Sequence, residues 1–272
     1  MLVPDPCYPI FADGPRIAGA ELYYMPLQKE NDYVIQLQDI PEEIARKAKF
    51  MLVSYPNNPT AAMAPESFYH EVVAFAKKYD IIVLHDNAYS ELVFDGQSCG
   101  SFLSIPGAME VGVEFNSLSK TYGLAGARIG FCVGNKEVVG MLKTLKSNMD
   151  YGMFLPIQAA AVEALTGNQA VVAETRAAYE HRRDVLCDGL IEAGWRMEKP
   201  AGTMFVWAPI PSSYQDSESF VADLLDKTGV LVTPGSAFGP SGEGYVRMAL
   251  VQSEATMKKT VEAVAASGIF GK

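Results

Sequence analysis

Residues 81–89, Ile-Ile-Val-Leu-His-Asp-Asn-Ala-Tyr, place a short apolar run directly before a group of polar side chains. The run at 81–84 is typical of a strand that is buried on both faces, as strands of parallel sheets are. Asp86 then follows at the carboxyl end of the strand, where open α/β sheets bind their ligands. This stretch therefore predicts a parallel sheet with a ligand site at its edge.

The segments on both sides of this stretch repeat the same alternation. Further strand-like runs occupy residues 2–3, 21–25, 50–55, 111–115 and 129–134, and helical stretches occupy residues 41–48 and 65–79. A β-α-β alternation of this kind is typical of a mostly parallel sheet with helices on both faces. Residues 1–155 are therefore predicted to form a large α/β domain.

The composition changes after residue 155. Residues 156–194 are rich in alanine and are predicted to form two linking helices, the second of them long, over 169–193. Shorter segments follow, with strands expected at 203–207, 230–232 and 245–250 and helices at 217–227 and 253–266. Residues 195–272 are therefore predicted to form a smaller C-terminal α+β domain.

The composition excludes several classes of function. The chain has 272 residues, with 22 Lys plus Arg and 32 Asp plus Glu, so its formal net charge is −10. Such an acidic chain is a poor candidate for binding nucleic acid. None of its apolar runs approaches the roughly 18–20 residues of a membrane span, and its first residues do not resemble a secretion signal. Its 4 cysteines form no CxxC pair, so we expect reduced thiols, a cytoplasmic location and no metal site.

Lys120 follows the predicted strand at 111–115 and is flanked by hydroxyl residues and glycine. Together with Ser117, Ser119 and Arg128 it forms a set of groups that suits a phosphate monoester. The lysine is either a phosphate ligand or a nucleophile that forms a Schiff base, and the P-loop frame GxxxxGK[ST] is not met. The alternative is that Lys120 and Arg128 are surface residues of a flexible loop.

Asp86 and Asn58 follow two other predicted strands. A carboxylate at the end of an apolar strand is costly to bury unless it is paired, so Asp86 is a candidate partner for a protonated heterocyclic nitrogen. The alternative is an N-cap for the segment that follows. His85 points to the opposite face of the strand and is expected in the core. Asn58 lies between Pro56 and Pro59, and either presents its amide to a ligand or only turns the chain.

Taken together, these segments resemble the fold-type I, class I and II aminotransferases, which use pyridoxal 5′-phosphate (PLP). The motifs are Tyr-Pro-Asn-Asn-Pro-Thr at 55–60, Asp-Asn-Ala-Tyr at 86–89, Ser-Leu-Ser-Lys at 117–120 with Arg128, and Arg247. They occur in the family's order along essentially the whole chain. The stretch 89–135 looks closest to the branch that contains the LL-diaminopimelate aminotransferases, although residues 124–127 depart from the usual Thr-Gly-Trp.

The resemblance implies a role for each of these residues. Lys120 would hold the cofactor as a Schiff base and then move a proton between the substrate α-carbon and the cofactor. Asp86 would pair with the pyridinium nitrogen of the cofactor. The other implied contacts are Asn58 and Tyr89 with the phenolate oxygen, Tyr8 with the ring face, Ser117, Ser119 and Arg128 with the phosphate, and Arg247 with Asn58 on the substrate carboxylate.

The function implied is PLP-dependent transfer of an amino group between an L-amino acid and a 2-oxo acid, by a homodimer as is usual in the family. The family normally begins well before this chain does. We therefore expect an N-terminally truncated large domain, an incomplete phosphate site and exposed apolar surface. Two alternatives stay open: another PLP enzyme on the same scaffold, of the C–S lyase type, and a catalytically incomplete aminotransferase-like binding fragment.

Overall fold

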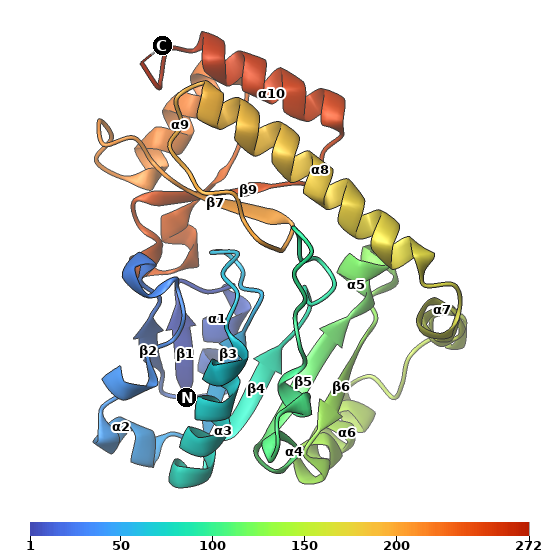
Figure 1. Ribbon diagram of the computed structural model, residues 1–272. Coiled ribbons are helices and arrows are strands. Elements are labelled where there is room, and N and C mark those ends of the chain that lie inside the picture. The colour runs from blue at the N-terminus through green and yellow to red at the C-terminus, as the bar shows by residue number, and fades with distance from the viewer. Residues whose placement is uncertain (272) are drawn as a thin grey trace.

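A computed structural model describes residues 1–271 and contains two β-sheets with helices packed around them (Figure 1). The first sheet has the strand order β2-β1-β3-β4-β5-β6. Its strands are β1 (Leu2–Asp5), β2 (Tyr23–Pro26), β3 (Phe50–Ser54), β4 (Ile82–Asp86), β5 (Gly112–Ser117) and β6 (Gly130–Gly134). All neighbouring pairs are parallel except β5 and β6, which are antiparallel. The prediction of a mostly parallel α/β sheet is confirmed.

Helices follow the strands of this sheet and pack against it. They are α1 (Ile10–Ile17), α2 (Glu42–Lys47), α3 (Glu66–Tyr79), α4 (Ala108–Val111), α5 (Leu118–Thr121) and α6 (Lys136–Met149). Phe68, Val72 and Ala76 of α3 recur at helical spacing and are buried in the same core as Val53 and Val83 of the sheet. Burial of each large apolar side chain stabilises the fold by about 1.5–3 kcal/mol, so this face fixes α3 on the sheet.

The second sheet is antiparallel, with the strand order β7-β9-β8. Its elements are β7 (Phe205–Pro209), α9 (Ser217–Thr228), β8 (Thr233–Pro234), β9 (Tyr245–Ala249) and α10 (Glu254–Ala266). Trp195, Phe220 and Val246 lie in its core. The strand expected at 230–232 is wrong, because Leu231 of that run is exposed and the strand pairing with β9 begins only at Thr233.

Two helices lie between the sheets in sequence: α7 (Leu155–Thr166) and the long α8 (Ala170–Glu192). Figure 1 shows α8 running from the side of α5, at the first sheet, to α10 beside the second sheet. Short 3-10 helices complete the described part: η1 (Lys29–Asn31), η2 (Leu37–Asp39), η3 (Phe102–Ser104), η4 (Ala125–Ala127), η5 (Gly235–Phe238) and η6 (Pro240–Gly242).

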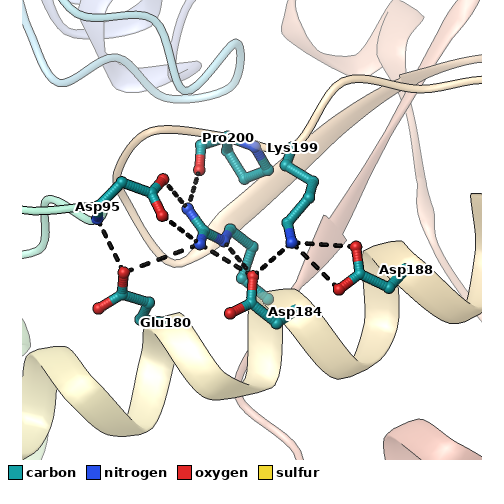
Figure 2. Close-up of polar contacts among 7 residues, drawn as sticks. Asp95, Glu180, Asp184, Asp188, Lys199 and Pro200 are labelled. Atoms are coloured by element: carbon teal, nitrogen blue, oxygen red, sulfur yellow. Dashed lines mark hydrogen bonds and ion pairs between the residues drawn. The ribbon is translucent and has the colours of Figure 1, made fainter.

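Arg183 of α8 is a charged side chain in the interior, only 2% exposed. Its Nη1 and Nη2 donate to both carboxylate oxygens of Asp95 at 2.6 and 2.9 Å, and Nη1 also donates to the carbonyl of Pro200 at 3.1 Å. Figure 2 shows these contacts, together with the bond from Nε to Asp184 at 3.0 Å. Asp95 belongs to the loop after β4 and Pro200 precedes β7. Arg183 therefore holds a loop of the first sheet against a segment of the second.

Among residues 1–271, no helix is both long and apolar enough to cross a membrane. Within the same residues, no group of three or more His, Cys, Asp or Glu side chains is arranged to hold a metal ion. The four cysteines are free thiols.

Candidate active site

Three side chains that are distant in sequence meet near the carboxyl ends of β4 and β5. Asp86 is the last residue of β4, Lys120 lies in α5 directly after β5, and Arg247 comes from β9 of the second sheet. Their charges are close enough to interact, because both Asp86 and Arg247 affect the pKa of Lys120. The structure therefore brings together an acid and a lysine from two of the strand exits singled out in the sequence, and an arginine that the family resemblance implied.

Asp86 is a half-buried carboxylate with few partners of its own. Burial raises the pKa of its carboxyl, while His85, the backbone N–H of Ala88 and Lys120 act in the opposite direction. Residues 88–90 form a turn, so Asp86 does not cap a helix as the alternative interpretation required. His85 is fully buried in the core, as expected. A carboxylate left in this state would be stabilised by a cationic partner.

Lys120 lies in the short helix α5, which begins within the motif Ser-Leu-Ser-Lys at 117–120. Ser117 is the N-cap of α5, and its Oγ accepts a hydrogen bond from the backbone N–H of Ser119 at 3.2 Å. The Nζ of Lys120 lies 6.0 Å from the ring centroid of Tyr89. Burial lowers the pKa of Lys120, and the positive charges of Arg128 and Arg247 lower it further. A lowered pKa enlarges the neutral fraction of the amine, which is its nucleophilic form.

Arg247 is fixed by an amide and by two aromatic rings. Its Nη1 donates to Oδ1 of Asn58 at 2.9 Å. Its guanidinium carbon lies 4.2 Å from the ring centroid of Phe205 and 4.6 Å from that of Phe238. The Nε of Arg247 is buried and has no hydrogen-bond partner in the described part of the chain. The planar group is thus held in one orientation with donor capacity to spare, which suits a carboxylate ligand.

Sequence reasoning missed Phe205 and Phe238 as site residues. Phe205 lies in the predicted strand at 203–207, where it was not distinguished from core residues. Phe238 is positioned by contacts with the other end of the chain, since its carbonyl accepts from the N–H of Cys7 at 2.9 Å. Gly239 next to it allows the close approach of Asp5, because a Cβ at this glycine would lie 2.0 Å from Oδ1 of Asp5. No signal in the sequence could have revealed these long-range contacts.

The remaining predicted site residues lie around this centre with different exposure. Tyr89 is buried, and burial raises the pKa of its hydroxyl. Tyr8 is 46% exposed, yet near enough to Tyr89 and Arg247 to affect their pKa values. Arg128 is exposed and has a left-handed backbone with φ of 53°; its Nη1 donates to the carbonyl of Ala125 at 3.0 Å.

Comparison with known proteins identifies the family of this chain. Residues 1–264 match the family described as aminotransferase class I and II. The chain belongs to this family, whose members use pyridoxal phosphate, and it is an enzyme of amino-group transfer. The resemblance seen in the sequence motifs is confirmed.

Its relatives support the narrower branch as well. The LL-diaminopimelate aminotransferase of Moorella thermoacetica is 48% identical over 261 residues, which make up 96% of this chain and 67% of that enzyme. The enzyme of the same name from Gloeobacter violaceus is 44% identical over 268 residues, covering 98% and 68% of the two chains.

Solved structures agree with these sequence relatives. Substrate-bound BacF from Bacillus subtilis superposes with a TM-score of 0.96 at 39% identity, over 100% of this chain and 69% of that one. A probable N-succinyldiaminopimelate aminotransferase from Thermus thermophilus has a TM-score of 0.91 at 33% identity, over 98% and 71%.

Proposed function

We propose that this chain holds pyridoxal phosphate between Asp86 and Lys120, and that it transfers the amino group of an L-amino acid to a 2-oxo acid there. The observation that carries this proposal is the position of Lys120, a lysine of lowered pKa, near both a poorly paired carboxylate and Arg247. When bound, pyridoxal phosphate supplies a cationic ring that accepts the electron pair released at the substrate α-carbon. Its ring nitrogen is the cationic partner that Asp86 otherwise lacks.

Lys120 would act on protons at the substrate α-carbon. Its Nζ in the neutral form takes a proton from this atom and returns one later in the transfer. Burial and the two nearby arginines keep this amine from being permanently charged. The ring of Tyr89, next to Nζ, limits the space in which the amine moves.

Arg247 and Asn58 would orient the substrate. The guanidinium, held between Phe205 and Phe238, presents a planar fork to the α-carboxylate. Because Asn58 already accepts from Arg247 through Oδ1, its amide N–H groups are the part that can donate to the phenolate oxygen, as the hydroxyl of Tyr89 also can.

The other contacts would hold the two ends of the cofactor. Ser117, Ser119 and Arg128 supply two hydroxyls and a guanidinium for the phosphate. Tyr8, half exposed beside Tyr89, would cover the ring face. The names of the relatives suggest LL-diaminopimelate as the first amino donor to test.

The direct test is to titrate the purified chain with pyridoxal phosphate, reduce the product with borohydride and map the peptides by mass. We expect a visible absorbance band and a pyridoxyl mass on Lys120, neither of which should form in Lys120→Ala. Transfer from LL-diaminopimelate to 2-oxoglutarate would then be assayed. A thioether substrate that releases a thiol without forming a new amino acid would instead favour the C–S lyase alternative. No band and no label would refute cofactor binding by this chain.

We also propose that the chain forms a homodimer through the side of the molecule around α6 and α7. This side, within the described residues, exposes Met149, Tyr151, Phe154, Leu155 and Val162, each by at least 60%. Large apolar side chains exposed in one region of the surface are typical of interaction sites, and a second copy would cover them. Light scattering after size exclusion should give twice the chain mass. Phe154→Asp should shift this toward the monomer, whereas Leu231→Asp, at an equally exposed position on the second sheet's side, should not.

A further inference from the structure

Four side chains converge on a buried carboxylate behind the active site. Glu114 is 3% exposed. Its Oε1 accepts from Nδ2 of Asn87 at 3.1 Å and from Nδ2 of Asn116 at 3.0 Å. Its Oε2 accepts from Oγ of Ser101 at 2.8 Å and from Nδ1 of His85 at 3.1 Å, so Nδ1 carries the ring proton. Both oxygens of this carboxylate are fully engaged.

The register of the sheet relates this cluster to the active site. In the parallel pair β4 and β5, His85 lies opposite Glu114, and Asp86 lies opposite the next residue, Phe115. Because side chains alternate along a strand, Glu114 and His85 share one face of the sheet and Asp86 points to the other. Asn87 directly follows Asp86 in the chain. Glu114 therefore holds the end of β4 from the face opposite the site.

The same carboxylate also holds the end of β5. Asn116 directly precedes Ser117, which begins the short helix that carries Lys120. Glu114 therefore binds both Asn87, the neighbour of Asp86 in the chain, and Asn116, the neighbour of Ser117. Hydrogen bonds to an ionised acceptor are roughly twice as strong as neutral ones, so a carboxylate is a stiffer anchor here than an amide would be.

We propose that Glu114 is a positioning residue that sets the spacing between Asp86 and Ser117, and with it the span available to the cofactor. This inference rests on the proposed function. Glu114 does not touch the cofactor site itself and acts through Asn87 and Asn116. In Glu114→Gln, one oxygen is replaced by an amide nitrogen that faces N–H or O–H donors, so one pair of donors loses its acceptor.

The experiment compares Glu114→Gln with a matched variant, Glu243→Gln. Glu243 also accepts several bonds, from the N–H of Ser217 at 2.6 Å and its Oγ at 3.1 Å, but it belongs to the second sheet's surroundings. Both variants should lower the melting temperature. Only Glu114→Gln should weaken the affinity for pyridoxal phosphate, by about tenfold, and change the pH at which the absorbance of the bound cofactor titrates.

Asn116→Ala leaves the carboxylate of Glu114 in place and removes only the hydrogen bond from Asn116 to it. It is therefore the variant to use if Glu114→Gln does not fold. It should weaken binding of pyridoxal phosphate more than binding of pyridoxal, which lacks the phosphate that Ser117 would contact. Affinities equal to that of the unmodified chain in both Glu114→Gln and Asn116→Ala would overturn the positioning role alone. If the unmodified chain itself fails to bind pyridoxal phosphate, the proposed function falls, and this inference with it.

Discussion

Glu114 carries its charge where water does not reach it, and the surrounding donors determine whether it can stay ionised. Burial opposes ionisation, but hydrogen bonds from His85, Asn116 and Asn87 outweigh it and lower the pKa of Glu114 to about 2. A carboxyl whose pKa is lower in the folded state stabilises that state above its unfolded pKa, and loses this contribution as the pH falls through the folded value. Glu114 should therefore contribute fully above about pH 4.5 and very little near pH 2.

This predicts how the stability of Glu114→Gln compares with that of the unmodified chain. The difference in the free energy of unfolding should be about 2 to 3 kcal/mol at pH 7 and should shrink as the pH falls from 4.5 toward 2, because glutamine does not titrate. Urea unfolding at pH 7, 4 and 3 measures it. A difference that stays constant across this range would mean that Glu114 is not held ionised by its donors.

At the residue scale, the sequence was informative where chemistry requires a rare residue at a strand exit. Lys120 and Asp86 could be singled out because charged groups are uncommon beside apolar strands, whereas Arg247, inside strand β9, was indicated only by the family resemblance. Glu114 was overlooked because it lies within a strand, where its four donors come from segments that only the sheet register brings together. Phe238 was overlooked for a similar reason, since a loop of the second sheet places it over Arg247.

At the scale of elements, helix α6 was not predicted, although its sequence carries a helical pattern. Val138, Leu142 and Leu145 recur at helical spacing, but none of the residues of α6 is buried within this chain. A second signal was Asn135, whose Oδ1 accepts from the N–H groups of Glu137 and Val138 at 3.0 and 3.2 Å. A cap of this kind begins a helix even where packing does not.

Because α6 depends on its cap, Asn135→Ala should lower the free energy of unfolding by about 1 kcal/mol. The side chain also donates to the carbonyl of Glu110 at 2.7 Å, which links the cap to α4. Asn148→Ala, in the last turn of the same helix, is the matched control, because the side chain makes only exposed bonds, to the carbonyl of Thr144 and the hydroxyl of Ser147. Chemical unfolding of both variants measures this difference. Equal losses of unfolding free energy in the two variants would show that the Asn135 cap does not stabilise α6 more than an ordinary exposed hydrogen bond does.

At the scale of the whole molecule, the alternation of strands and helices was sufficient to predict the first sheet, but not how the two sheets are joined. That join depends on Arg183, whose partner Asp95 lies 88 residues earlier in the chain (Figure 2). The loop with Asp95 also pairs with the segment before β7 through Val93 and Gly202. The rings of Tyr89 and Phe205, 5.8 Å apart between centroids, lie in the same region, so the Arg183–Asp95 pair and the bridge at Val93 both help to hold the two rings together.

Asp95→Ala tests how much this join contributes. Asp95 itself is largely exposed, but the guanidinium of Arg183 is not, so water cannot replace the lost carboxylate without opening the contact between α8 and the loop. We expect a loss of about 2 kcal/mol in the free energy of unfolding. Glu254→Ala is the control, because Glu254 joins α10 to α8 through His181 at a surface where water replaces the partner, and little change is expected there. Comparable losses in the two variants would indicate that Arg183 retains its place without Asp95, held by Asp184 and the carbonyl of Pro200.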